Sequence, residues 1–370
     1  MKKNILINPG LKKIKSRYAY STLSNLIVRN LKYHTNSYNF IILIEKNKKN
    51  QNHIKKNKNK YIKYILIKTL NNKILNYLKL LFVINFTAIK FKVDLICSLS
   101  NYGLIFSFKP QLIYIHDFGS FIFNSKLDNR NKIPRFFTNL IQSISVRKSE
   151  YLIFNSKFIS KFFLKKFKSK GFKNYGIVGC TYKNFYSTKF KKENSILFIG
   201  GFFGLKNQEF LINYFNNFNN NIKLIIAGVD YDKNYYNFCK KIKQNNNQIK
   251  IFKNPTDEKL KELYNKSKFY ISPSLFEGFS ITPLEALSAN CKIILSDIQA
   301  HKEIYGNKIH YFKTKNLTSL KRVFDKSKSN NYKNICNDLY NKKLKYEFSE
   351  KNFINKIIMS FDNYFKNHVL

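Results

Sequence analysis

The chain has 370 residues, of which 44% are hydrophobic and 16% aromatic. A chain of this length and composition can bury at least one full core, which excludes simple disorder. The 67 basic residues outnumber the 21 acidic ones and give a formal net charge of +46, a balance that favours an anionic partner.

Short apolar runs alternate with longer amphipathic stretches, an order typical of β-α-β units around parallel sheets. The first series of predicted strands is Asn4–Asn8, Phe40–Glu45, Tyr64–Ile67, Leu95–Ser98, Leu112–Ile115 and Tyr151–Phe154. The second series is Ile196–Ile199, Lys223–Ala227, Ile249–Phe252, Phe269–Ile271 and Lys292–Leu295. The sequence therefore predicts an α/β protein with two Rossmann-like halves.

The segment between the two series, residues 176–194, has two glycines, many Lys, Asn, Ser and Thr residues and little helical periodicity, so we expect an interdomain linker there. The expected domains are 1–185 and 186–348. Residues 349–370 form a last helix, because apolar side chains recur in them at helical spacing. The basic run Lys46–Lys60 is predicted to be a solvated loop.

The cysteines and the apolar segments limit where the protein works. The five cysteines lie far apart with no C-x-x-C pair, so neither a zinc site nor a disulfide framework is indicated and a reducing cytoplasm is expected. The apolar part of the amino terminus is too short for a signal peptide. The most apolar stretch, Leu80–Ile89, has about half the length that a membrane-spanning helix needs.

The most informative segment is residues 269–306, FYISPSLFEGFSITPLEALSANCKIILSDIQAHKEIYG. A structural interpretation explains Glu285, because Thr282 as N-cap, Pro283 at N1 and Glu285 at N3 would form a capping box. It does not explain Glu277, which lies on a loop at the carboxyl end of a strand, where open α/β sheets place their ligands. Backbone amides of residues 278–284, at the positive end of the helix, would bind phosphate oxygens.

The pattern E-G-F-S-x-x-P-L-E-A-L at residues 277–287 resembles the E-x7-E signature of the family 4 retaining glycosyltransferases. This resemblance implies the GT-B fold, in which two Rossmann-like domains with parallel sheets face a central cleft. It implies that residues 1–185 bind the acceptor, that residues 186–348 bind the nucleotide sugar, and that the helix in residues 349–370 crosses back to the first domain. It also implies that Glu277 is catalytic and orients the donor sugar, while Glu285 binds the ribose. Gly278, Phe279 and Ser280 are expected to contact the donor.

Two further blocks of the second half are similar to the same family. Residues 196–215 contain Gly200 and Gly201 after the strand, followed by Lys206, whose counterpart in the family contacts the donor diphosphate. Many members have Arg directly after the first glycine, where this chain has Gly201. Asn254 and Pro255 match a turn whose backbone would face the nucleotide base.

In the first half, residues 112–117, LIYIHD, resemble the strand-His-Asp of the family. The resemblance gives His116 a catalytic role near the donor sugar. The alternative is a structural histidine at a strand end. The usual glycine-rich loop after the first strand is present only as Asn8, Pro9 and Gly10, so the sequence says little about the acceptor.

The resemblance implies a retaining transferase that moves a hexose from GDP-mannose or a UDP-hexose to a lipid-linked or polysaccharide acceptor of the cell surface. Lys206 and the helix amides would stabilise the leaving diphosphate, so we expect no metal and no cofactor besides the donor. A nucleotide-sugar epimerase and an inactive donor-binding relative are the alternatives. A nucleic-acid-binding protein is the remote one, because only six of the basic residues are Arg.

The charge is unevenly spread, since residues 1–185 hold 36 basic and five acidic side chains while residues 186–370 hold 31 and 16. In the first half, Phe158–Lys170 alternates Phe and Ile with Lys and would lie on an anionic membrane. The alternative is an ordinary amphipathic helix packed on its sheet. We therefore expect a cytoplasmic protein, peripheral on the inner face of the plasma membrane if this segment binds lipid.

Overall fold

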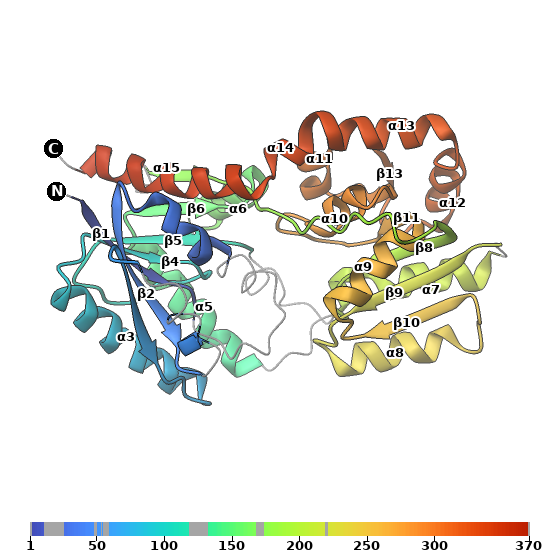
Figure 1. Cartoon of the computed structure of the whole chain (residues 1–370). Helices are drawn as coiled ribbons and strands as arrows, with labels where there is room; N and C mark the ends of the chain where they lie inside the picture. The colour runs from blue at the N-terminus through green and yellow to red at the C-terminus, as the bar shows by residue number, and fades with distance from the viewer. Residues whose placement is uncertain are drawn as a thin grey trace. The chain divides into compact units, whose positions relative to one another are not determined.

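The structure is a computed structural model that describes residues 2–10, 26–47, 50–52, 54, 59–117, 132–167, 174–218 and 221–368 (Figure 1). The described residues form two compact units. The first unit holds the residues up to Gly179 together with those from Ile354 onward, and the second runs from Cys180 to Phe353. The division thus falls a few residues before position 185, where the composition of the sequence had placed it.

The first unit is built on a seven-stranded parallel sheet with the order β3-β2-β1-β4-β5-β6-β7. Its strands are β1 (Lys3–Asn8), β2 (Tyr38–Glu45), β3 (Ile62–Ile67), β4 (Leu95–Ser98), β5 (Gln111–Ile115), β6 (Tyr151–Phe154) and β7 (Tyr175–Ile177). The central strands are buried on both faces, which is why they consist of nearly unbroken Ile and Leu runs.

Within the described ranges, the helices of the first unit with defined bounds are a 3₁₀ helix (Leu31–His34), α3 (Lys73–Lys90), α5 (Lys132–Arg147), α6 (Lys157–Phe167) and most of α15 (Glu350–His368), and residues 26–30 are helical as well. The helix α3 begins at Asn72, whose side chain accepts hydrogen bonds from the backbone N–H groups of Ile74 and Leu75. No helix among the described residues is long and apolar enough to cross a membrane.

The helix α6 covers residues 158–167 of the segment Phe158–Lys170. Ile159, Phe163 and Phe167 are buried, and the ring of Phe163 packs against Phe154 of the neighbouring strand β6. The apolar side of α6 is therefore used inside the first unit, as in the alternative of an ordinary packed helix. Lys168 and Lys170 lie outside the described residues, as do residues 48, 49, 53 and 55–58 of the basic run Lys46–Lys60.

The last helix, α15, packs with the first unit from Ile354 onward. The hydroxyl of Tyr38 in β2 donates a hydrogen bond to the carboxylate of Asp362, and the ring of Phe361 meets Tyr38 edge to face at 5.9 Å. Asp362 and the burial of Tyr38 both raise the pKa of the phenol. The apolar positions that predicted a helix in residues 349–370 thus pack on strands far away in the sequence.

The second unit has a six-stranded parallel sheet with the order β10-β9-β8-β11-β12-β13. Its strands are β8 (Glu193–Ile199), β9 (Lys223–Gly228), β10 (Ile249–Lys253), β11 (Ser267–Ser272), β12 (Lys292–Ser296) and β13 (His310–Phe312). Its α-helices are α7 (Gln208–Asn217), α8 (Lys233–Lys243), α9 (Asp257–Lys266), α10 (Thr282–Ser288), α11 (Gln299–Tyr305), α12 (Leu317–Lys326), α13 (Asn330–Leu339) and α14 (Lys345–Glu347). A 3₁₀ helix (Gly204–Lys206) and a π-helix (Tyr340–Leu344) complete it.

All the strands predicted from apolar runs are present, and several begin earlier than predicted. The sequence did not predict β7 and β13, which have three residues each. The expected linker, residues 176–194, contains most of β7 and the first two residues of β8, so that prediction was wrong at both ends. The search for apolar runs missed the polar residues with which β8 and β11 begin. These residues belong to the sheet, because Ser267 pairs with Glu193 and its hydroxyl lies 3.3 Å from that of Ser195.

Candidate functional site

The predicted donor residues lie at the carboxyl edge of the second sheet, where loops follow the strands. Because all six strands are parallel, the loops after β8, β9, β10 and β11 leave the sheet on the same side. The loop after β8 supplies Gly200, Gly201 and Lys206, and the loop after β11 supplies Glu277. Since β8 and β11 are neighbours in the sheet, these two loops meet.

Glu277 and Lys206 form an ion pair with 2.5 Å between Oε1 and Nζ. The hydroxyl of Ser274 donates to the same Oε1 atom at 2.8 Å. Only 12% of the Glu277 side chain and 20% of the Lys206 side chain are exposed, so the pair is partly shielded from water. Both hydrogen bonds from described residues end on Oε1, which leaves the lone pairs of Oε2 for a ligand.

Ser280 is held in a left-handed backbone conformation, with φ of 68°, by two buried side chains. The hydroxyl of Tyr305 donates to the Ser280 carbonyl at 2.6 Å, and Nε2 of His301 lies 3.0 Å from the Ser280 hydroxyl. His301 Nδ1 lies 2.8 Å from the carbonyl of Ser296, which makes Nδ1 the donor and Nε2 an acceptor. Burial lowers the pKa of His301 to about 4, so the ring is neutral and positions the loop.

Sequence reasoning did not assign His301 or Tyr305, although both lie in the segment that carried the resemblance. Phe279 has a similar supporting role, because its buried ring packs against Phe348 with 5.1 Å between centroids. These residues fix the shape of the loop that carries Glu277 and Gly278. The sequence does not show that His301 meets Ser280, because 21 residues separate them and only the folded chain brings them together.

The capping-box interpretation of Glu285 was wrong. Ile281 already has helical dihedrals, and its carbonyl accepts a hydrogen bond from the Glu285 backbone N–H, so Thr282 is not the N-cap. The Thr282 hydroxyl instead lies 2.6 Å from the hydroxyl of Tyr270. The Glu285 carboxyl accepts a hydrogen bond of 2.8 Å from the hydroxyl of Tyr264.

Glu285 sits deep in the second unit, although part of its side chain reaches the surface. Burial raises the pKa of its carboxyl to about 7, an effect that the Tyr264 hydrogen bond and the nearby Lys183 cation oppose. At neutral pH the group is therefore divided between its neutral and charged forms.

Three glycines allow the backbone to pass closely at this edge. A Cβ atom on Gly228 would lie 1.9 Å from the Gly200 carbonyl oxygen, so β8 and β9 end in direct backbone contact. A Cβ atom on Gly201 would lie 2.4 Å from the ring of Tyr231. The space into which an arginine at position 201 would extend is thus filled by Tyr231, which follows β9.

Asn254 follows β10 with a φ of 50°, and its backbone N–H donates to the Gly228 carbonyl at 2.8 Å. Its side-chain amide donates to Asp230 Oδ1 at 3.1 Å, and Lys253 Nζ lies 2.7 Å from Asp230 Oδ2. The Asn254–Pro255 turn therefore stands beside the end of β9, at the same edge of the sheet as Lys206.

The prediction of a metal-independent site overlooked an Asp-x-Asp triplet, Asp230-Tyr231-Asp232. Asp230 is paired with Lys253, as described above, which lowers the pKa of its carboxyl. Asp232 caps α8, because its carboxylate accepts hydrogen bonds from the backbone N–H groups of Asn234 and Tyr235 at 2.9 and 3.0 Å. Within the described residues, no group of three or more His, Cys, Asp or Glu side chains could hold a metal ion.

His116 lies in the first unit, directly after β5. Its Nε2 lies 3.1 Å from the Leu99 carbonyl, its backbone N–H donates to Asn101 Oδ1 at 2.6 Å, and Asn155 donates to its carbonyl. Burial lowers the pKa of the imidazole. These contacts fit the structural alternative, and the catalytic role of His116 stays a prediction.

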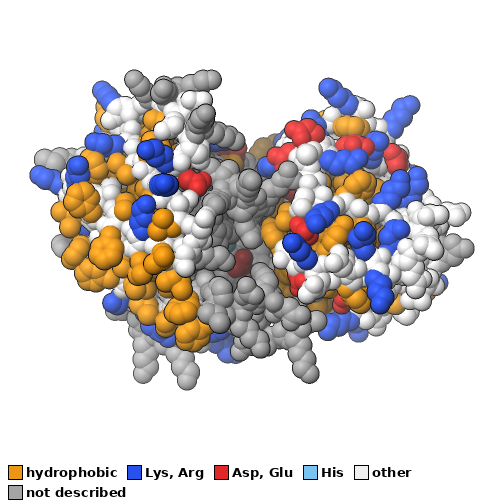
Figure 2. All heavy atoms as spheres, turned by 90° about the horizontal axis from the view of Figure 1, so that it is seen from below, with side chains coloured by type: hydrophobic (Ala, Val, Ile, Leu, Met, Phe, Trp, Pro, Cys, Tyr) orange, Lys and Arg blue, Asp and Glu red, His pale blue; other side chains and the backbone are white. Residues whose placement is uncertain are grey.

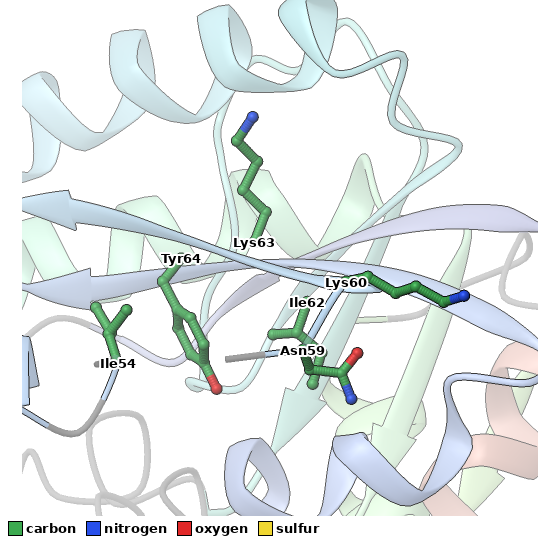
Figure 3. A pocket seen from close by; sticks show the side chains of 6 residues that line it. All are labelled: Ile54, Asn59, Lys60, Ile62, Lys63 and Tyr64. Carbon is green, nitrogen blue, oxygen red and sulfur yellow. The ribbon is translucent and has the colours of Figure 1, made fainter. Parts of the chain in front are cut away.

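A surface hollow of the first unit is formed around the start of β3 (Figure 3). It is lined by Ile54, Asn59, Lys60, Ile62, Lys63 and Tyr64. None of these residues was predicted as a site residue, and the lining holds no pair of groups suited to acid–base chemistry. The candidate site is therefore the carboxyl edge of the second sheet.

Comparison with known proteins finds relatives of the part of the chain that carries this edge. Residues 183–346 match the model of the glycosyl transferases group 1. Over 201 residues the chain is 24% identical to the O-antigen chain mannosyltransferase RfbU of Salmonella typhimurium. The matched region covers 54% of this chain and 55% of that protein. Over 78 residues it is 38% identical to the GDP-mannose:cellobiosyl-diphosphopolyprenol alpha-mannosyltransferase of Xanthomonas oryzae pv. oryzae, covering 20% of each. The chain thus spans about half or less of the length of these relatives.

Solved structures share the fold over nearly the whole chain. A glycosyltransferase from Rickettsia africae superimposes with a TM-score of 0.73 at 16% identity and covers 99% of both chains. HepE from Anabaena, crystallised with UDP and glucose, superimposes with a TM-score of 0.70 at 12% identity and covers 97% of this chain and 99% of its own. The two parallel sheets are those of the GT-B glycosyltransferases. Residues 183–346 are therefore similar to the glycosyl transferases group 1 family, and the chain has the fold of the GT-B glycosyltransferases.

Proposed function

We propose that the protein is a retaining hexosyltransferase that moves a mannosyl group from GDP-mannose to a lipid-linked or polysaccharide acceptor in cell-surface glycan synthesis. The observation that carries the proposal is the pairing of Lys206 with Glu277 at the carboxyl edge of a group 1 domain. The choice of mannose rests on the relatives, two of which are named mannosyltransferases. A UDP-hexose is the competing donor, because HepE was crystallised with UDP and glucose.

Lys206 supplies the positive charge for the donor diphosphate. Its ammonium is a point charge on a flexible stem, and a diphosphate that enters beside it would compete with Glu277 for that charge. Gly200 and Gly201 have no side chain to block the approach of phosphate oxygens to the backbone. Charge that develops on the leaving diphosphate would be stabilised by Lys206 and by the backbone N–H groups around Gly278.

Glu277 orients the donor sugar. Its Oε1 atom is occupied by Lys206 and Ser274, so Oε2 is the atom that would accept a hydrogen bond from a sugar hydroxyl. The loop is held by Ser280, His301 and Tyr305, which keeps the carboxylate in one place. Precise placement of the anomeric carbon relative to the diphosphate is what the transfer requires.

Glu285 and the turn at Asn254 and Pro255 complete the nucleotide site. The partly exposed carboxyl of Glu285 would accept hydrogen bonds from the ribose hydroxyls. The backbone of Asn254 and Pro255 would face the base, which leaves little trace in side-chain identity. Base preference is therefore a question for measurement.

In the reaction, the bond between the anomeric carbon and the diphosphate oxygen breaks while the acceptor oxygen bonds to the same carbon. The acceptor proton passes to an oxygen of the departing diphosphate on the same face of the sugar, so the anomeric configuration is retained. No side chain is assigned as a covalent nucleophile. We propose that no metal takes part, because Asp230 and Asp232 are engaged in structural contacts.

The test measures donor binding and turnover separately. Thermal shift with GDP, UDP, GDP-mannose and UDP-glucose should give the largest stabilisation with GDP-mannose. Turnover is then followed with an extract of lipid-linked acceptors, and the anomeric configuration of the product is read by NMR. Conversion of the donor without acceptor would indicate an epimerase, and binding without turnover an inactive relative. If none of the four nucleotides stabilises the protein, the proposal fails.

A further inference from the structure

The helix α3 exposes large apolar side chains along its whole outer face. Ile74, Leu75, Leu78, Phe82, Phe86 and Ile89 are all exposed, with 74% of Phe82 and 67% of Phe86 accessible. Residues 74, 78, 82 and 86 repeat every fourth position, so they form one stripe that is about 18 Å long. In Figure 2, hydrophobic side chains gather on the unit that carries α3.

The opposite face of α3 is already used by the core of the first unit. Leu80, Ile84 and Ala88 are buried and pack against the sheet, where they contact Leu6 and Leu43 among others. A helix with apolar side chains on both faces is usually in contact with other apolar groups on both faces. Within the described residues the inner face has a partner in the sheet, and the outer face is the one that needs explaining.

The loop before β5 adds two exposed phenylalanines to this stripe, and α3 holds them in place. The buried side chain of Asn85 donates to the Phe106 carbonyl at 3.1 Å and accepts from the Phe108 backbone N–H at 3.0 Å. The hydroxyl of Tyr77 anchors the same loop through Gly103 and Ile105. Phe106 and Phe108 are exposed, with 4.8 Å between ring centroids. We call these two rings and the six helix residues the α3 surface.

The sequence segment that contains α3 carries charge of a single sign. Between Lys46 and Val93 the sequence has thirteen lysines and neither Asp nor Glu. Lys68 and Lys90 are exposed near the two ends of the helix, and Lys63 and Lys92 are exposed on the neighbouring segments. An apolar stripe with lysines at its rim is the composition of an interfacial helix whose apolar face enters a bilayer.

We propose that the α3 surface lies on an anionic phospholipid bilayer, with Phe82 and Phe86 inserted among the acyl chains. A second copy of this chain fits less well, because two such faces would bring lysines together with no carboxylate between them. The apolar side chains of α3 protrude from the helix, and the interior of a bilayer can surround such side chains without a matching surface. The strands of the first sheet are parallel, so β3 and β5 end on the same side of the sheet. The helix α3 follows β3 and therefore begins on the side where β5 ends at Ile115. This surface is distinct from α6, whose apolar side chains Ile159, Phe163 and Phe167 are buried.

Vesicle flotation tests the proposal with the full chain. The wild type should float with vesicles that contain phosphatidylglycerol, less with pure phosphatidylcholine, and less again in high salt. The double variant Phe82→Ser/Phe86→Ser should bind the anionic vesicles at least about tenfold more weakly, because each serine removes an inserted ring. The control Phe238→Ser/Tyr346→Ser changes two exposed rings of the second unit and should bind as the wild type does.

A tryptophan probe locates the contact independently of affinity, because the chain contains no tryptophan. With Phe82→Trp, emission should shift to the blue on adding anionic vesicles, and brominated lipid should quench it. With Phe238→Trp neither change is expected. Equal binding of Phe82→Ser/Phe86→Ser and wild type, or a Phe82→Trp emission that brominated lipid does not quench, would overturn the proposal. Light scattering that shows a wild-type dimer and a monomeric double variant would also overturn it, in favour of a second copy.

Discussion

Lys206 and Glu277 are 71 residues apart in the chain, yet the ammonium of one lies 2.5 Å from the carboxylate of the other. The pair joins the loops after β8 and β11, which are adjacent in the second sheet. In the proposed reaction the cation serves the diphosphate and the carboxylate serves the sugar. Each can therefore be removed with a different effect on binding and transfer.

Lys206→Ala should weaken the binding of a free nucleoside diphosphate by at least about tenfold, because it removes a charge-assisted contact. Glu277→Gln should bind the same diphosphate as well as the wild type or better, since the lysine loses its carboxylate partner. Transfer by Glu277→Gln should fall on the order of a hundredfold or more. Calorimetry with GDP and a transfer assay measure the two effects. Lys302→Ala, at an exposed lysine of α11, is the control, and a fully active Glu277→Gln would refute the role given to Glu277.

Glu285→Gln should raise stability in neutral and weakly alkaline solution. The folded pKa is about 7 and the ordinary value 4.5, so between these values the unfolded chain binds fewer protons and wild-type stability falls as pH rises. The cost of burying the ionised carboxyl above pH 7 is about 3 kcal/mol, and it vanishes below the unfolded pKa. Thermal unfolding of both proteins at several pH values tests this, with Glu258→Gln, exposed on α9, as the control. A lower stability of Glu285→Gln at alkaline pH would contradict it.

Gly201→Arg should destabilise the second unit, although an arginine is common at this place in related enzymes. Its Cβ atom would meet the Tyr231 ring at 2.4 Å, and displacing the ring costs about 1 to 3 kcal/mol. The double variant Gly201→Arg/Tyr231→Ala should recover much of the loss, which melting temperatures of the four proteins would show. Gly228→Ala should lower stability more than Gly201→Arg, because its Cβ atom would meet the Gly200 carbonyl oxygen, which is backbone, at 1.9 Å. Additive effects of the two changes would rule out the clash.

Transfer should persist in EDTA, because Lys206 and backbone amides replace a metal in the proposed reaction. Asp232→Ala should lower stability by about 1 kcal/mol through loss of the α8 cap, with little change in the rate per folded molecule. Rates with EDTA, and after adding Mg²⁺ or Mn²⁺, provide the measurement. A rate that EDTA abolishes, that Mn²⁺ restores and that Asp232→Ala also loses would make the Asp-x-Asp triplet a metal site.

Much of the fold was predictable because the strands are marked locally. The buried strands of parallel sheets are near-continuous apolar runs, so β1, β4 and β6 were predicted to within one residue. The three-residue strand β13 was not, because so short a segment carries no period of its own. The capping box at Thr282 failed for a related reason, since a helix start depends on the dihedrals of Ile281, and the sequence does not display them.

The sequence by itself determined the two series of strands and the spacing of Glu277 and Glu285, because these depend on neighbours within one segment. Only the tertiary structure decided which distant residues meet. The strand order β9-β8-β11 brings Tyr231 to Gly201 and Lys206 to Glu277, and no local pattern encodes that order. The same holds for α3, which is apolar on both sides. The sheet covers Leu80 and Ile84 and leaves Phe82 and Phe86 exposed, because packing against the strands, and not hydrophobicity alone, selects the inner face.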